Sequence, residues 1–133
     1  MAVLFADTFY FIALLDSADA RHKQAVAWSR RRVHSLLTTE YVLLELGDAF
    51  HSPGKREEFA VFQDAVRADP KLHVLHSSPQ LYAAGLELFR RRTDKSWQLT
   101  DCISFALMED RGVRNALTGD KHFEQAGFTS LLK

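Results

Sequence analysis

Short apolar runs alternate with segments of helical periodicity along this chain, and that alternation constrains its fold more than any other feature. The apolar runs cover residues 2–6, 33–38, 71–76 and 113–118, and a last strand is expected near residues 128–132. Runs of this length are typical of strands, whereas the segments between them carry helical patterns or capping signals. Strands separated by helices predict an α/β domain with three layers, in which helices flank a central, mostly parallel β-sheet.

Capping residues mark where several of the expected helices begin. Thr39 and Thr100 can each cap the helix that follows, and Ser78 precedes Pro79, which suits the first helical position. Gly112 is expected to end the helix that begins after Thr100. Helices are expected over residues 20–32, 57–68, 101–110 and 122–125, besides those that begin after residues 7, 39 and 78.

Length and charge narrow the classes of protein further. The 133 residues suit one domain that spans residues 1–133, with a core of its own. The 17 Lys and Arg residues balance 17 Asp and Glu residues, so the formal net charge is zero. No global positive field therefore attracts phosphates, and any contact with a nucleic acid must be local.

Cysteine content and hydropathy indicate in which cellular compartment the protein is expected. The single cysteine, Cys102, excludes an intramolecular disulfide and a multi-cysteine zinc site, and we expect it to be a packed core thiol. A lone cysteine suits a reducing compartment, so we expect a cytoplasmic protein. The apolar stretch over residues 3–15 contains Asp7 and is too short for a membrane span, so no membrane association is expected.

Four acidic residues are expected to meet at one edge of the sheet. Asp7 follows the first strand, Asp120 comes two residues after Thr118 at the end of the fourth, and Asp101 begins a helix. In a parallel sheet the strand ends and helix starts gather at the carboxyl edge, where ligands bind. Glu45 lies about 9 Å along its helix, within side-chain reach of the same edge.

Four carboxylates in one cleft repel one another unless a cation neutralises them or some of them take up protons, and a hard divalent cation is the natural occupant. Ligation by oxygen alone selects Mg²⁺ or Mn²⁺ over zinc. A metal held this way can lower the pKa of a water molecule and stabilise a leaving oxygen, so the implied chemistry is hydrolysis of phosphodiester bonds. Glu40 is also acidic, but its place in the first turn of a helix explains it.

Three segments of the chain resemble the PIN-domain nucleases, and most closely the VapC-like toxins of toxin–antitoxin pairs. The segments are VLFADTFYFIALLD, TTEYVLLELGDAF and SWQLTDCISFALMEDRGVRNALTGDKHFEQAGF. The resemblance implies that Asp7, Glu45, Asp101 and Asp120 are the catalytic, metal-binding acids of the family, and that Thr118 is the hydroxyl residue near the last acid, which we expect to bind substrate. One position departs, because Phe9 stands where the family often has a small or polar residue.

The same resemblance implies an activity and partners. We expect an endoribonuclease that depends on Mg²⁺ or Mn²⁺, acts as a toxin on RNA, is inhibited by a cognate antitoxin and forms a homodimer. Helices near the N-terminus, with Phe9, Tyr10 and Trp28 on or near them, are candidates for the groove that accepts the antitoxin.

Basic residues give local candidates for RNA contact. Arg92, at the end of an arginine run, and Lys95 precede Asp101 and are expected to bind the phosphate backbone. The other arginine run, residues 30–32, is explained as a solvated helix end. Trp97 is expected to hold the loop in place, and the six histidines show no spacing typical of metal ligands.

Three other functions compete with this one. A phosphohydrolase with an aspartate nucleophile usually needs a second acid two residues later, where Phe9 stands. A catalytically silent RNA-binding module would have no reason to keep four clustered acids at a cost in repulsion. A PIN nuclease of RNA maturation, without an antitoxin, remains open on the sequence alone.

Overall fold

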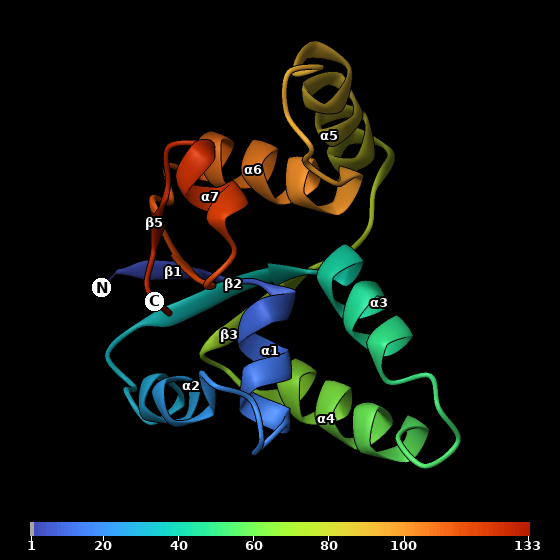
Figure 1. The fold of residues 1–133 in the computed structure, drawn as a ribbon, viewed down its shortest axis with the longest axis vertical. Helices are drawn as coiled ribbons and strands as arrows, with labels where there is room; N and C mark the ends of the chain where they lie inside the picture. The colour runs from blue at the N-terminus through green and yellow to red at the C-terminus, as the bar shows by residue number, and fades with distance from the viewer. Residues whose placement is uncertain (1) are drawn as a thin grey trace.

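The computed structural model describes residues 2–133 and contains one five-stranded sheet (Figure 1). The strands are β1 (Val3–Ala6), β2 (Ser35–Thr39), β3 (Leu72–Leu75), β4 (Asn115–Leu117) and β5 (Thr129–Ser130). They lie in the order β3-β2-β1-β4-β5, and every pairing is parallel. All five expected strands are confirmed, and the sheet is wholly rather than mostly parallel.

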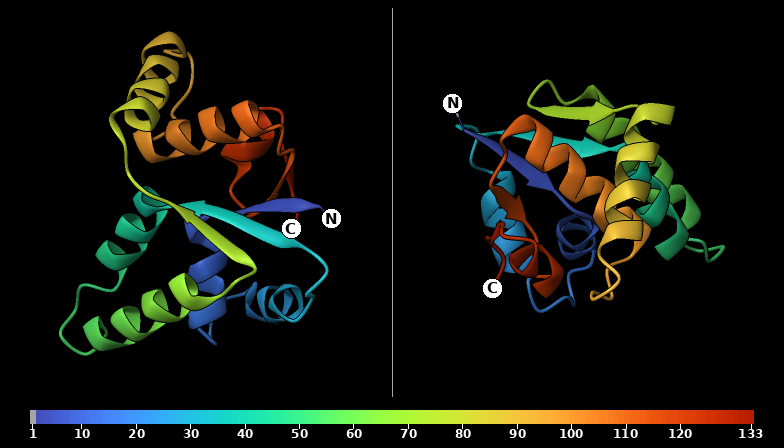
Figure 2. Two further views of the ribbon diagram at one scale, coloured as in Figure 1. Left: turned by 180° about the vertical axis from the view of Figure 1, so that it is seen from behind. Right: turned by 90° about the horizontal axis from the view of Figure 1, so that it is seen from above.

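Helices cover both faces of the sheet, which confirms the three layers. They are α1 (Thr8–Leu15), α2 (His22–Ser29), α3 (Glu40–Ala49), α4 (Arg56–Ala68), α5 (Pro79–Arg91), α6 (Leu99–Arg111) and α7 (Lys121–Gln125). Seen from the front and from behind, α1, α2 and α4 lie on one side of the sheet, and α6 and α7 on the other (Figures 1 and 2). Helix α5 packs on α6 so closely that a Cβ on Gly85 would lie 2.3 Å from the Ile103 side chain.

Aromatic side chains fill the space between these layers. On the α6 and α7 side, the ring of Phe123 lies edge-on to Phe105 at 4.9 Å and 6.2 Å from Phe5 of the central strand. On the other side, the ring centres of Phe11 of α1 and Phe62 of α4 are 5.6 Å apart. Phe5, Phe11 and Phe123 are almost completely buried, so the central strand and the helices beside it form a rigid base for the residues that follow β1 and β4.

Two of the three predicted helix caps are confirmed. The Thr39 hydroxyl accepts the backbone N–H of Val42 at 3.1 Å, and the Ser78 hydroxyl accepts that of Leu81 at 3.0 Å. The left-handed Gly112, with φ of 67°, ends α6 as expected.

The predicted cap at Thr100 is wrong, because α6 begins at Leu99, two residues before the expected start at Asp101. Gln98 is the cap, and its backbone N–H donates to the Asp101 carboxylate at 3.2 Å. This is one half of a capping box, in which the side chain three residues into the helix reaches back to the cap. Asp101 therefore determines where its own helix begins.

The topology brings three helix starts to the carboxyl edge of the sheet. Helix α1 follows β1 after one residue, α3 follows β2 directly, and α7 begins soon after β4. Within residues 2–133, the structure has no helix with the length and hydropathy needed to cross a membrane.

Candidate active site

Asp7 lies at the junction of β1 and α1, and its side chain is almost completely buried. The Thr118 hydroxyl donates a hydrogen bond to Asp7 Oδ2 at 2.9 Å. Burial raises the pKa of Asp7 to about 7, against the lowering effect of the Thr118 hydrogen bond, and the charges of Asp101 and Glu45 raise it further. A buried carboxylate with two acidic neighbours needs a proton or a cation close to it.

Glu45 reaches this edge from the middle of α3, where it is half-buried. The Thr8 hydroxyl, at the start of α1, donates a hydrogen bond to Glu45 Oε1. Burial raises the pKa of Glu45, the Thr8 hydrogen bond opposes this, and the charges of Asp101 and Asp120 raise it again. Thr8 therefore orients one oxygen of Glu45.

Asp101 and Asp120 come from the starts of α6 and α7. Asp101 is 6% exposed, and burial followed by the charge of Asp120 raises its pKa. Asp120 caps α7 by accepting the backbone N–H of His122 at 2.9 Å. Its own backbone N–H donates to the Thr118 hydroxyl at 3.1 Å.

The structure brings the four predicted acids together. The charges of Asp101 and Glu45 raise the pKa of Asp7, those of Asp101 and Asp120 raise the pKa of Glu45, and that of Asp120 raises the pKa of Asp101. We refer to Asp7, Glu45, Asp101 and Asp120 as the acid cluster. Their catalytic roles remain predictions, but their convergence at the carboxyl edge is a property of the fold.

Thr118 is placed differently from the prediction. Its side chain is fully buried, and its hydroxyl bonds both to the Asp7 carboxylate and to the Asp120 backbone. A side chain without exposed surface has no access to substrate. The structure therefore gives Thr118 a positioning role, linking two acids, in place of the predicted substrate contact.

Phe9, the residue that departs from the family pattern, packs against the loop that carries Asp120. A Cβ on Gly119 would lie 2.5 Å from the Phe9 ring and 2.6 Å from the Leu132 carbonyl oxygen. Only glycine fits between them without displacing one or the other. The large side chain at position 9 thus supports the loop between Thr118 and Asp120.

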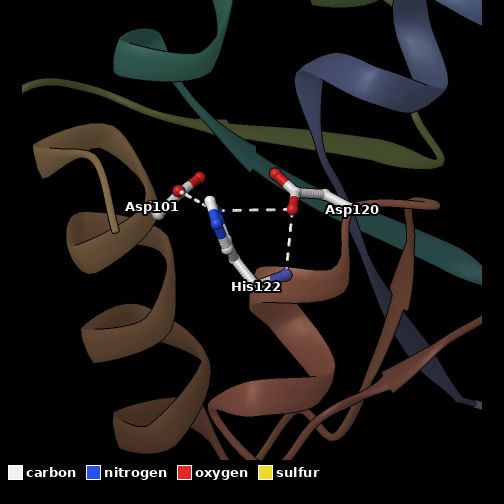
Figure 3. Close-up of side chains that lie close together, drawn as sticks. All are labelled: Asp101, Asp120 and His122. Atoms are coloured by element: carbon white, nitrogen blue, oxygen red, sulfur yellow. Dashed lines mark hydrogen bonds and ion pairs between the residues drawn. The ribbon is translucent and has the colours of Figure 1, made fainter. Parts of the chain in front are cut away.

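His122 is the residue that the sequence interpretation missed. Figure 3 shows its imidazole between the two carboxylates, with Nδ1 at 3.2 Å from Asp101 Oδ2 and 3.4 Å from Asp120 Oδ1. Ligand atoms of these three residues all lie within 4.8 Å of one another, so together they could hold a metal ion. The expectation that no histidine is spaced as a metal ligand is wrong for His122. The sequence signal that could have identified His122 is its position two residues after Asp120, in the first turn of the helix that Asp120 caps.

The basic candidates lie in the loop before α6. Arg92 is paired with Asp94, with Nε at 2.9 Å from Oδ1, and its guanidinium lies 4.9 Å from the centre of the Trp97 ring. Lys95 is half-buried. The contact of Arg92 and Lys95 with RNA stays a prediction.

Two other predictions for this region are confirmed. Trp97 is 5% exposed and its indole N–H donates to the Gln125 side-chain oxygen at 3.1 Å, so it holds the loop against α7. Cys102 is a buried thiol, as expected for the core.

The donor atoms suit a hard divalent cation. Carboxylate oxygens predominate, and burial together with the charges of neighbouring acids raises the pKa of Asp7, Glu45 and Asp101. A divalent cation among these oxygens would stabilise the charged forms of the acids.

Comparisons with known proteins agree with this geometry. The family model described as PIN domain matches residues 4–129. The 23S rRNA-specific endonuclease VapC20 of Mycobacterium tuberculosis is 28% identical over 131 residues, which cover 97% of this chain and 98% of that protein. The crystal structure of VapC20, described as a toxin that cleaves the sarcin–ricin loop, matches with a TM-score of 0.86 over 99% of this chain and all of the other.

More distant structures share the fold alone. VapBC2 from Rickettsia felis, bound to a fragment of its promoter DNA, is 12% identical with a TM-score of 0.68, over 97% of this chain and 96% of that one. FitAcB from Neisseria gonorrhoeae is 16% identical with a TM-score of 0.65, over 96% of each chain.

Proposed function

This chain belongs to the PIN domain family, and on that premise we propose that it is an endoribonuclease that depends on Mg²⁺ or Mn²⁺. The observation that carries the proposal is the acid cluster at the edge of the sheet where ligands bind, in which burial, followed by the charges of neighbouring acids, raises the pKa of Asp7, Glu45 and Asp101. Such a cluster is costly to keep unless a cation occupies it.

Asp7, Asp101 and Asp120 would hold the metal, with Glu45 beside them. A divalent cation in this position supplies Lewis-acid stabilisation of the charge that develops on the scissile phosphate. Thr118 holds Asp7, and Thr8 holds one oxygen of Glu45. The carboxylates are therefore oriented before substrate arrives, which lowers the cost of reorganisation during the reaction.

The reaction would be hydrolysis of a phosphodiester bond. A water oxygen forms a new bond to phosphorus while the bond from phosphorus to a ribose oxygen breaks. Glu45 would take the proton from that water, and its raised pKa supports this role because it makes Glu45 a better base than an exposed glutamate. The ribose oxygen that leaves takes up a proton from solvent.

Ribosomal RNA is the substrate class that we propose to test first. Support comes from the relative named as a 23S rRNA-specific endonuclease, which aligns with nearly all of this chain. Because the net charge is zero, binding would depend on local basic groups such as Arg92 and Lys95. The Asp94 partner of Arg92 would have to give way to a phosphate.

We also propose that the protein is the toxin of a pair and that a cognate antitoxin covers it. Structures of VapBC complexes are among the relatives of this fold. A pocket lies between α1, α2 and α4, and its apolar walls include Tyr10, Phe11, Trp28 and Phe62. A side chain from an amphipathic segment could enter this pocket. Phe9 does not line it, because its ring packs against Gly119. A homodimer of the protein is part of the same proposal and is checked by light scattering.

The test of the nuclease is incubation of the purified protein with ribosomes and with total RNA, with and without Mg²⁺, followed by mapping of new RNA ends. We expect new ends only with metal, and their rate of formation should fall sharply in Asp101→Asn. Asp110→Asn, an exposed position at the other end of α6, is the matched control and should cleave as the parent does. Cleavage by Asp101→Asn at the parental rate would contradict the proposed site.

The test of the toxin is separate. Expression of the intact protein should slow growth, and co-expression with an adjacent small gene should restore it. Normal growth together with RNA cleavage in vitro would favour the alternative, a PIN nuclease of RNA maturation without an antitoxin.

A further inference from the structure

The imidazole of His122 faces two carboxylates through one nitrogen. Its Nδ1 lies 3.2 Å from Asp101 Oδ2 and 3.4 Å from Asp120 Oδ1 (Figure 3). A nitrogen lone pair directed at two carboxylate oxygens would be repelled by both. The arrangement therefore needs either a hydrogen on Nδ1 that donates to the carboxylates or a metal ion that all three ligand atoms share.

The position of this imidazole follows from well-packed parts of the fold. The backbone N–H of His122 donates to Asp120 at 2.9 Å, so the residue belongs to the same turn as the acid it faces. The next residue, Phe123, is fully buried and lies edge-on to Phe105 at 4.9 Å. Helix α7 is thus held against the core, and the His122 ring is presented to Asp101 of α6 with little freedom to move.

The spacing of the three ligand atoms fits a common coordination sphere. Two ligands at right angles, each about 2.1 Å from a metal ion, are about 3 Å apart. The two distances from Nδ1 are close to this value, and all three ligand atoms lie within 4.8 Å of one another. A small shift of the side chains would place one ion in contact with all of them.

We propose that His122 Nδ1 is a ligand of the metal held by Asp101 and Asp120, and that this nitrogen makes the site prefer Mn²⁺ to Mg²⁺. The inference rests on the proposed function, because it concerns the same metal. Mg²⁺ binds oxygen ligands almost exclusively and keeps several waters, whereas the later divalent metals accept imidazole more readily. One nitrogen among carboxylates therefore shifts selectivity without excluding Mg²⁺.

The test is a spectroscopic measurement on the purified protein with Mn²⁺ as the probe. Electron spin echo modulation of bound Mn²⁺ should show coupling to a directly bound ¹⁴N nucleus in the parent, and this coupling should disappear in His122→Gln. The affinity for Mn²⁺ should fall at least about tenfold in that variant. The affinity for Mg²⁺, measured by competition, should change by less than about threefold.

His73→Gln is the matched control, because His73 is an exposed imidazole on β3. Both the nitrogen coupling and the affinities should stay parental in this variant. Circular dichroism should show that both variants keep the parental fold, and His122→Asn provides a second variant if His122→Gln does not.

Two results would overturn the inference, and they differ in what they say of the proposed function. If the acid cluster binds Mn²⁺, as judged by its loss in Asp101→Asn, but no nitrogen coupling is seen, His122 only donates a hydrogen bond and the proposed metal site stands. If the parent binds no Mn²⁺ at all, both the nitrogen ligand and the metal dependence fail.

Discussion

Two glutamates of α3, Glu40 and Glu45, lie in electrostatic surroundings that shift their pKa values in opposite directions. Glu40 accepts the backbone N–H of Ser77 at 2.6 Å and pairs with the Arg67 guanidinium at 2.8 Å. These bonds lower the pKa of Glu40 to about 2, whereas burial and nearby acids raise the pKa of Glu45. Protein groups thus compensate the negative charge of Glu40 at the start of α3. Glu45, further along the same helix, has no such positive partner among the described ion pairs.

Ion pairing separates the structural carboxylates from those of the acid cluster. Within residues 2–133, the ion pairs of the acid cluster involve His122 alone, whereas arginine side chains pair with several acids elsewhere, Glu40 and Asp69 among them. Positive side chains are therefore available in this chain but are not directed to the acid cluster. That asymmetry is expected of a site that takes its positive charge from a metal ion.

The largest expected effect is on RNA cleavage. Asp101→Asn should lower the cleavage rate by about two to three orders of magnitude, because one member of the metal-binding set is lost. Glu40→Gln should leave the rate within about twofold of the parent. Rates are measured on the same RNA at saturating Mn²⁺, and an equal loss in both variants would remove the distinction between the two regions.

The next effect is stabilisation by metal. A ligand that binds only the folded state at about 100 times its Kd stabilises it by about 2.7 kcal/mol. Mn²⁺ should therefore raise the Tm of the parent and of Glu40→Gln by similar amounts, and that of Asp101→Asn by much less. Thermal unfolding with and without chelator measures this difference, and a full increment in Asp101→Asn would place the ion elsewhere.

A smaller effect concerns stability without metal. The pKa of Asp7 is raised in the folded state, so folding takes up a proton and stability falls as pH rises from about 4 to about 7. Asp7→Asn keeps an oxygen that can accept the Thr118 hydrogen bond but removes the charge. At pH 8 with chelator, it should be about 1–2 kcal/mol more stable than the parent, with little difference at pH 4.

Urea unfolding at the two pH values checks the prediction for Asp7. A clear loss of stability at pH 8 would mean that Asp7 acts mainly as a structural cap for α1. The metal site would then have to be formed by the other three acids.

The smallest expected effect is the change in the free energy of unfolding caused by Glu40→Gln. Its pKa is lowered in the folded state, so its contribution to stability is present above about pH 4.5 and is lost as pH falls toward about 2. Glu40→Gln should destabilise the metal-free protein by about 0.5 kcal/mol at pH 7, because its ion pair with Arg67 is partly exposed. Urea unfolding at pH 7 measures this loss, and a gain in stability would contradict the comparison with Asp7→Asn.

Local signals in the sequence were sufficient for much of the fold and for the acids. The apolar run before Asp7 and the caps at Thr39 and Ser78 determine where elements begin, and in a parallel sheet their ends must share an edge. The cap of α6 is harder to predict, because the start of this helix depends on the Asp101 side chain reaching back to Gln98.

The role of His122 could not be read from spacing along the chain. Its contact with Asp101 crosses between two helices and depends on how α7 packs against α6. The burial of Thr118 is likewise a result of packing, since a hydroxyl at the end of a strand can equally face solvent. Pattern and periodicity predict which elements form, but contacts between distant elements need the assembled structure.

The hydrogen bond from Thr118 to Asp7 joins residues 111 positions apart, so it bears on how the protein folds. Closing so long a loop costs entropy that only the complete core repays. Glu45 and Asp101 lie in α3 and α6, whereas Asp7 and Asp120 precede α1 and α7, so no continuous fragment shorter than most of the chain contains all four acids. Partly folded molecules should therefore have no nuclease activity, and activity should return in refolding experiments together with the last tertiary signals rather than with helix content.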